Sequence, residues 1–146
     1  MDMNHMPILS YDDIEIGTCL GPIKKTPSLE DVKTFCRAYR MEESNRFTDI
    51  NVARKEGVLR LIVPGVMSMA YLSQLITDWA PNISIKRLDL IFRAPVNQEK
   101  TIDCVGIVTD KEVRNGENYL ECDLYILDAD GQRPVTGKVI AVLATT

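Results

Sequence analysis

The sequence is poor in histidine and has no paired cysteines, and both shortages restrict its chemistry. Its only histidine is His5, in a terminal segment where a mobile side chain is expected, so a mechanism has to work without histidine. The cysteines are scattered without a CxxC pair, which argues against a metal site and favours free thiols, most of them in the core. They are Cys19, Cys36, Cys104 and Cys122.

Clustered positive charge and long apolar runs are also missing. The net charge is -4, the pI is about 5.0, and the longest basic pair is Lys24-Lys25, so no nucleic-acid partner is expected. No apolar run reaches the roughly 18 to 20 residues that span a bilayer. The start MDMNHMPILSYDD lacks a signal-peptide pattern, so we expect no membrane association and a cytoplasmic location.

What remains is the composition of an ordinary globular protein. The 146 residues are 45% hydrophobic and 26% charged, which suits one domain with a real core. We therefore predict a flexible terminus over residues 1–10 and a single domain over residues 11–146.

The stretch Val63–Trp79 is apolar in almost every direction around a helix. Such a helix is normally wrapped by other structure. It opens on Pro64-Gly65, where proline gives up no needed hydrogen bond, and it is expected to end before Pro81. Its few polar residues are Ser68, Ser73, Gln74, Thr77 and Asp78.

Shorter elements precede this central helix. Tyr11–Lys25 reads as a first strand with a turn and a bulge at its two glycines. Ser28 and Asp31 form a capping box, which predicts a helix running to about Met41. One or two helical turns are expected before Gly57.

Four strands are predicted after the central helix, over residues 83–96, 101–113, 118–130 and 133–145. Apolar and polar residues alternate most clearly around Leu120–Ile126, and turns are expected at Asn115-Gly116 and Asp130-Gly131. We predict that these strands are successive antiparallel neighbours. The central helix is the element apolar enough to fill the concave face of such a sheet, which gives an α+β fold.

Three segments carry a family resemblance: RMEESNRFTDINVA, VPGVMSMAYL and LIFRAPV. Together they resemble the MaoC-like (R)-specific enoyl-CoA hydratase and dehydratase family, over about residues 11–143. The resemblance implies a hotdog fold, in which an antiparallel β-sheet wraps a long central α-helix. It also implies an acyl thioester substrate, carried by coenzyme A or a carrier protein, and no cofactor.

Alignment on Asp49 and Ala53 places Glu42 where the family has its catalytic Asp and Phe47 where it has its catalytic His. Phe47 cannot carry a proton. Glu42 keeps a carboxylate on a stem that is longer by one methylene.

Three further positions depart from the family pattern. Met41 replaces a glycine, Asn45 replaces a proline, and Pro64 replaces the histidine of the His-Gly-Met that opens the family's central helix. These substitutions put the ordinary hydratase mechanism in question.

The candidate catalytic residues are Glu42 and Asn45. A Glu42 buried beside Phe47 would suit acid–base chemistry because burial disfavours the charged carboxylate. The other interpretation, that this polar loop is solvated, stays open for Glu42 and is preferred for Glu43 and Arg46.

The candidate binding residues lie mainly at the start of the central helix. Unpaired amides there, with the positive end of the helix dipole, suit a thioester carbonyl and the enolate that develops on it. Arg93 could bind a coenzyme A phosphate or form a surface ion pair. The predicted set is Phe47, Pro64, Gly65, Val66, Met67 and Arg93.

Two functional hypotheses follow. The chain is either a hydratase/dehydratase-type lyase, or a biosynthetic relative, that uses Glu42 as its acid or base, or it is a catalytically degenerate binding subunit of a hetero-oligomeric enoyl-CoA hydratase. A single sheet with an open edge also favours pairing. We expect a homodimer or a hetero-oligomer with a related hotdog subunit.

Overall fold

The structure is a computed structural model that describes residues 8–145. His5 and most of the predicted flexible terminus lie outside the described residues. In chain order the elements are η1 (Tyr11–Asp13), β1 (Cys19–Lys25), α1 (Leu29–Ala38), α2 (Ile50–Lys55), α3 (Gly65–Trp79), β2 (Ile83–Phe92), β3 (Ile102–Arg114), β4 (Glu117–Leu127) and β5 (Val135–Leu143).

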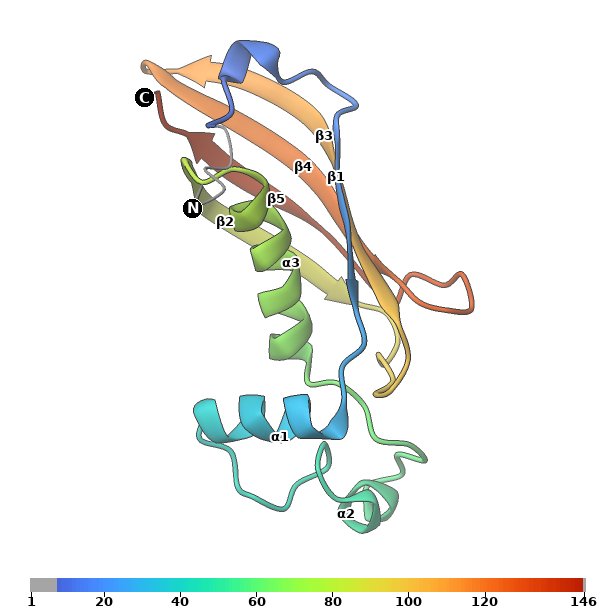
Figure 1. The fold of residues 1–146 in the computed structure, drawn as a ribbon. Coiled ribbons are helices and arrows are strands. Elements are labelled where there is room, and N and C mark those ends of the chain that lie inside the picture. Colours follow the sequence, from blue (N-terminus) through green and yellow to red (C-terminus); the bar gives the residue numbers. More distant parts are fainter. Residues whose placement is uncertain (1–7, 146) are drawn as a thin grey trace, which may run out of the picture.

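The five strands form one antiparallel sheet in the order β1-β3-β4-β5-β2, and α3 lies across its concave face (Figure 1). The turn between β3 and β4 has positive φ at both Asn115 (51°) and Gly116 (78°). A two-residue hairpin turn needs these angles to match the right-handed twist of its strands. The four predicted strands and the first strand are all present. The sheet wrapped on a central helix is confirmed.

The predicted neighbour order is wrong for one strand. β2 pairs with β5, from Ile83 opposite Leu143 to Phe92 opposite Val135, and not with β3. Apolar–polar alternation sets which side chains face the core, but it does not set which strand lies alongside. β2 is therefore an edge strand, and the edge at the other side of the sheet is β1.

The sheet covers most of α3 but not all of it. Buried side chains of the helix meet the sheet, and Leu72 and Ile76 have no exposed surface at all. Ala70, Gln74 and Thr77 are exposed, and their spacing puts them on one face of the helix. One strip of the central helix is thus left uncovered by residues 8–145.

α1, α2 and the loop between them lie beyond the amino end of α3 (Figure 1). The capping box of α1 is confirmed, since the Ser28 hydroxyl accepts from the Asp31 amide and the Asp31 carboxylate accepts from the Ser28 amide, both at 3.0 Å. These bonds hold the pKa of Asp31 below its usual value. The helix ends at Ala38, earlier than predicted, because the chain turns with φ of 59° at Arg40.

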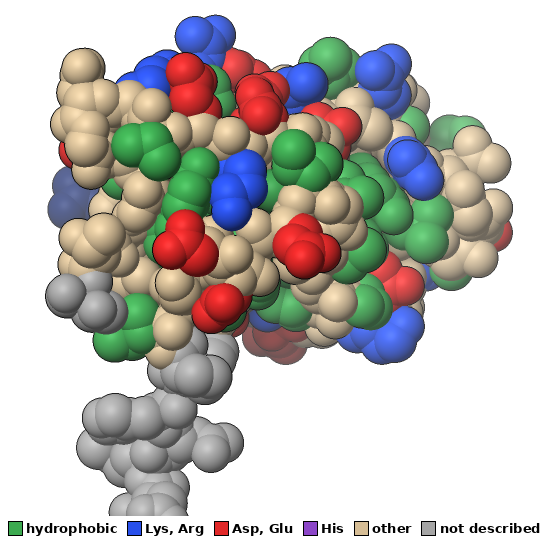
Figure 2. All heavy atoms as spheres, turned by 90° about the horizontal axis from the view of Figure 1, so that it is seen from above, with side chains coloured by type: hydrophobic (Ala, Val, Ile, Leu, Met, Phe, Trp, Pro, Cys, Tyr) green, Lys and Arg blue, Asp and Glu red, His purple; other side chains and the backbone are tan. Residues whose placement is uncertain are grey.

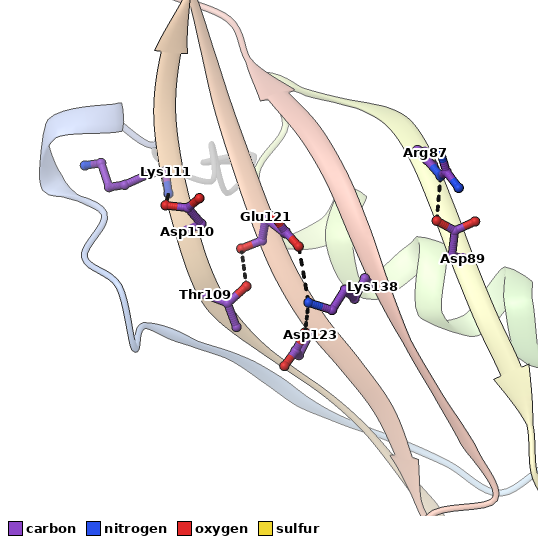
Figure 3. Close-up of polar contacts among 8 residues, drawn as sticks. All are labelled: Arg87, Asp89, Thr109, Asp110, Lys111, Glu121, Asp123 and Lys138. Atoms are coloured by element: carbon purple, nitrogen blue, oxygen red, sulfur yellow. Dashed lines mark hydrogen bonds and ion pairs between the residues drawn. The ribbon is translucent and has the colours of Figure 1, made fainter.

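The outer face of the sheet carries charged side chains of both signs (Figure 3). Lys138 lies between Glu121 and Asp123, at 3.3 and 3.6 Å, and Arg87 pairs with Asp89 at 2.6 Å. Such exposed pairs contribute little to stability, because water and salt screen them. On the face seen in Figure 2, acidic and basic side chains alternate with hydrophobic ones.

The predicted free cysteines are confirmed. Cys36, Cys104 and Cys122 are buried and Cys19 is exposed, with no disulfide among them. Burial raises the pKa of Cys104 to about 11 and that of Cys122 to about 12. Within residues 8–145, no helix combines the length and apolar composition needed to cross a membrane.

Candidate functional site

Asn45 organises the loop that carries the predicted catalytic residues. Its side-chain NH2 donates to the Glu42 carbonyl at 2.7 Å, and its side-chain oxygen accepts from the Phe47 amide at 2.8 Å. Its backbone amide donates to the Thr48 hydroxyl at 3.0 Å. Both ends of the Asn45 amide are thus used inside the loop, which gives it a shaping role rather than a free catalytic group.

The loop ends at the cap of α2. The Asp49 carboxylate accepts from the Asn51 amide at 2.9 Å and from the Ser44 hydroxyl at 3.0 Å. These hydrogen bonds hold the pKa of Asp49 below its usual value. The side chains of Ser44 and Asp49 therefore fix the shape of the loop near Glu42.

Glu42 itself is exposed and lines a cavity of about 560 Å³, which we call the Glu42 cavity. Glu42 is therefore not buried beside Phe47, the arrangement that would suit acid–base chemistry. It is exposed, and Phe47 lines a different cavity. The residues of the Glu42 cavity come from α1, from the loop and from the approach to α3. They are Leu29, Glu30, Lys33, Cys36, Arg37, Met41, Glu42, Glu43, Ser44, Thr48, Asp49, Ile50 and Leu61.

A second cavity, of about 400 Å³, opens at the start of α3, and we call it the helix-start cavity. It brings together three of the predicted binding residues, Phe47, Gly65 and Arg93. Its full lining is Arg46, Phe47, Ile62, Val63, Gly65, Ser68, Phe92, Arg93, Ala94, Pro95, Val96 and Val135.

Among residues 8–145, two backbone amides at this helix start have no hydrogen-bond partner. The Met67 and Ser68 amides both donate to the Pro64 carbonyl, at 3.0 and 3.1 Å, while Pro64 has no N–H to offer. The two unpartnered amides belong to Gly65 and Val66, first-turn residues whose amides have no acceptor within the helix. Gly65 lines the helix-start cavity and Val66 does not. The Met67 amide is bonded to Pro64 and its side chain is buried in the core at 5% exposure, so the Met67 amide is not one of those without a partner.

Gly65 is closely approached by an aromatic ring. A Cβ atom at this position would lie 3.3 Å from the ring of Phe92, tighter than ordinary van der Waals contact. The Phe92 ring, at the end of β2, therefore lies directly beside the free amides, and it is still 49% exposed. A larger residue than glycine would fill the space next to the donors.

The helix-start cavity has two arginines and no acid–base group. Arg46 pairs with Glu56 at 2.8 Å, as its predicted solvated role implies. Arg93 donates to the Thr136 hydroxyl at 3.1 Å and has no acidic partner within residues 8–145. None of the lining residues carries a carboxylate or an imidazole. The lining therefore combines apolar side chains with the arginines and the Gly65 backbone.

Several solved structures are similar to this chain. An (R)-hydratase from A. caviae involved in PHA biosynthesis matches with a TM-score of 0.80 at 19% identity, over 90% of this chain and 98% of that one. A chain of the ChsH1-ChsH2 complex from Mycobacterium tuberculosis matches with 0.77 at 21% identity, over 89% and 98%. A MaoC-like dehydratase from Rhodospirillum rubrum matches with 0.76 at 14% identity, over 92% and 97%. No protein-family model and no curated protein matches the sequence.

This chain has the hotdog fold. The match covers nearly the whole length of all three structures, so the fold predicted from the resemblance to MaoC-like proteins is confirmed. At these identities the likeness shows the fold alone. The roles of the individual residues have to be argued from the geometry of this hotdog domain.

Gln98 holds the Phe47 side of the cavity in place. It is 8% exposed, and its side-chain NH2 donates to the carbonyls of Phe47 at 2.7 Å and Ile62 at 2.9 Å. The preceding residue, Asn97, forms a β-bridge with Ile62. Residues 97–98 therefore contact the segment that leads into α3 through both a backbone bridge and a side chain. Gln98 thus fixes Phe47 against the helix start of the hotdog domain.

Sequence reasoning missed three residues of this region: Ser68, Phe92 and Gln98. Phe92 stands directly before Arg93 in LIFRAPV, and Ser68 is one of the few polar residues of α3, so both carried a signal. Gln98 stands in the polar run NQEK and carried none. Its role arises only from the tertiary contact with Phe47 and Ile62.

Proposed function

We propose that this hotdog protein binds an acyl thioester, carried by coenzyme A or a carrier protein, at the helix-start cavity. We further propose that it acts as the binding subunit of a hetero-oligomer with a related hotdog subunit that supplies the acid–base pair. One observation carries this proposal: the cavity has hydrogen-bond donors and apolar walls, but no carboxylate or imidazole among its lining residues.

The thioester carbonyl would accept from the amides of Gly65 and Val66. The positive end of the α3 dipole favours charge that develops on this oxygen, which is the electrostatic need of a hydration or dehydration next to a thioester. The acyl group would lie against Phe47, Ile62 and the other apolar lining residues. Arg93, which has no acidic partner within residues 8–145, would meet a phosphate of coenzyme A.

The edge strand β2 is the surface that we propose for the partner subunit. Ile91 and Phe92, at its end, are 55% and 49% exposed although both are large and apolar. An unpaired strand edge favours the addition of another strand. Because Phe92 also lines the helix-start cavity, a partner paired along β2 would lie next to the bound thioester. It could then place its own acid–base residues there.

The comparisons support an assembly of this kind. One of the similar structures is described as a complex of two named chains, ChsH1 and ChsH2. The other arrangement is a homodimer, and analytical ultracentrifugation of the purified chain, alone and with the related subunit, distinguishes the two.

A second candidate function rests on Glu42. This carboxylate lines a cavity of its own with a volume of about 560 Å³, so a substrate could reach it there. In that case the chain would be a hydratase/dehydratase-type lyase with Glu42 as its acid or base.

The two functions are separated by a hydration assay with crotonyl-CoA. The binding-subunit proposal predicts that the chain binds crotonyl-CoA in calorimetry but does not hydrate it. Adding a related hotdog subunit that keeps the Asp and His pair should then give faster hydration than that subunit alone. Hydration by the isolated chain that disappears in Glu42→Gln would contradict the proposal and support the second candidate. Absence of binding would refute thioester binding itself.

A further inference from the structure

A third cavity lies on the outer face of the sheet, on the side away from α3, and we call it the outer-face groove. Its volume is about 400 Å³, within the range of roughly 300 to 1,000 Å³ that is usual for small-molecule sites. It shares no lining residue with the helix-start cavity or the Glu42 cavity. Its lining is Asp89, Ile91, Asp123, Leu124, Tyr125, Arg133, Thr136, Gly137 and Lys138.

Two rows of side chains on β2, β5 and β4 form the floor of this groove. Residues two apart on a strand face the same side of a sheet, so the rows lie about 7 Å apart along the strands. The first row is Asp89, Lys138 and Asp123 (Figure 3). The second row is Ile91, Thr136 and Tyr125. The acidic side chains of the first row have cationic partners, and the second row carries no charge of its own.

Two guanidinium groups are held beside the second row. Arg93 donates from Nε to the Thr136 hydroxyl at 3.1 Å, and its backbone amide donates to the Pro134 carbonyl at 2.8 Å. The guanidinium of Arg133, the residue before Pro134, lies 4.0 Å from the centre of the Tyr125 ring. Thr136 and Tyr125 are opposite each other in the β4–β5 ladder. Both arginines are therefore fixed at the same end of the groove.

These two arginines have no acidic partner among the described residues. Arg114 shows the contrast, since it also lies over a tyrosine, Tyr119, but pairs with Glu112 at 2.8 Å. The Thr136 hydroxyl accepts from Arg93, and its own hydrogen has no acceptor within residues 8–145. This end of the groove thus offers hydrogen-bond donors and positive charge that the described part of the chain does not use.

We infer that the arginine end of the outer-face groove binds a phosphate monoester, with Arg93, Arg133 and Thr136 as its donors. A guanidinium matches a phosphate through parallel N–H···O bonds. The contacts with Thr136 and Tyr125 already restrict both arginines, so less side-chain freedom is lost on binding. The carboxylates of the groove lie in the other row, away from the bound anion.

Two sources would supply this phosphate. One is the 3′-phosphate of coenzyme A, because Arg93 also lines the helix-start cavity and so connects it to the outer face. This source rests on the proposed function. The other is a separate phosphorylated small molecule, for which the groove is a site of its own.

The first measurement needs no thioester. In an NMR titration with inorganic phosphate, the amide resonances of Arg133 and Thr136 should shift and reach saturation. Arg133→Gln should weaken phosphate binding by about 10-fold or more, the effect of hydrogen bonds to a charged group. Thr136→Val should also weaken it, whereas Thr136→Ser, which keeps the hydroxyl, should not. Absence of saturable shifts, or an equal loss in the matched control Arg114→Gln, would overturn the inference.

The second measurement identifies the source by comparing crotonyl-CoA with crotonyl-3′-dephospho-CoA in calorimetry. If coenzyme A supplies the phosphate, the dephospho form should bind the wild type about 10-fold more weakly, and Arg133→Gln should bind both forms equally. If a separate molecule supplies it, both forms should bind the wild type equally, and inorganic phosphate should still bind in the presence of crotonyl-CoA. If neither thioester binds, the proposed function fails, while the phosphate titration still decides this inference.

Discussion

The two cavities at the amino end of α3 differ in the chemistry they offer. The helix-start cavity has apolar walls, free donors and positive charge, and no acid–base group. The Glu42 cavity is larger and has four carboxylates and two cationic side chains in its lining. Glu42, predicted as the acid or base, and Phe47, Gly65 and Arg93, predicted as binding residues, thus line separate cavities in this hotdog domain.

The loop around Asn45 explains this separation. Asn45 bonds to the Glu42 carbonyl on one side and to the Phe47 amide on the other, so the chain turns between these two residues. Phe47 packs against the core and lines the helix-start cavity, while Glu42 is exposed. The phenyl ring of Phe47 supplies an apolar wall to the helix-start cavity.

The largest effect is expected from Gly65→Val. The new side chain would collide with the Phe92 ring, because even a Cβ atom lies 3.3 Å from it, and would cover the free amides. Crotonyl-CoA affinity measured by calorimetry should fall by about 100-fold or more, since at least two hydrogen bonds and the local space are lost. Ala70→Val, at an exposed position of the same helix, is the control and should bind normally. Normal binding by Gly65→Val would place the ligand elsewhere.

Much of this fold could be predicted from the sequence. The capping box at Ser28, the Pro64-Gly65 helix start and the Asn115-Gly116 turn are local signals, and each was correct. The place of β2 beside β5 could not be predicted, because alternation does not specify a neighbour. The site was only partly predictable: a family alignment gives positions along the chain, but the direction of Glu42 and the contact of Gln98 with Phe47 depend on tertiary packing.

A smaller effect is expected from Gln98→Leu, which removes the donor that holds the Phe47 side of the helix-start cavity. Gln98 is buried, and its side-chain NH2 donates to the carbonyls of Phe47 and Ile62, so both carbonyls would lose a donor in this variant. The free energy of unfolding in urea should fall by about 1–3 kcal/mol. Gln132→Leu, at an exposed turn position, serves as the control. Equal stability of the two variants would mean that Gln98 does not hold this region.

The loop that separates the cavities should weaken in acid. The pKa of Asp49 lies below its ordinary value of 3.8, because the carboxylate accepts from Asn51 and Ser44. Its stabilising contribution is therefore fully present above pH 3.8 and is lost as the pH falls through its lower folded-state pKa. Asp49→Asn should be less stable than the wild type at neutral pH, and this difference should shrink well below pH 3.8, as followed by urea denaturation. A difference that does not depend on pH, or one equally present in Asp130→Asn, would contradict this role.

The smallest effect is expected from Glu42→Gln. Because Glu42 is exposed and lines the other cavity, crotonyl-CoA affinity should stay within about twofold of the wild type, as for a surface substitution. Loss of binding in this variant would show that Glu42 belongs to the ligand site, and it would favour the acid–base role predicted for Glu42 from the sequence.

Amide NMR of the ligand complex tests the central claim most directly. If the thioester carbonyl binds at the start of α3, saturating crotonyl-CoA should move the amide resonances of Gly65 and Val66 downfield and slow their hydrogen exchange. The amides of Glu42 and Glu43 should change little. Strong shifts at Glu42 and Glu43, with Gly65 and Val66 unaffected, would show that the ligand occupies the Glu42 cavity and would contradict this account.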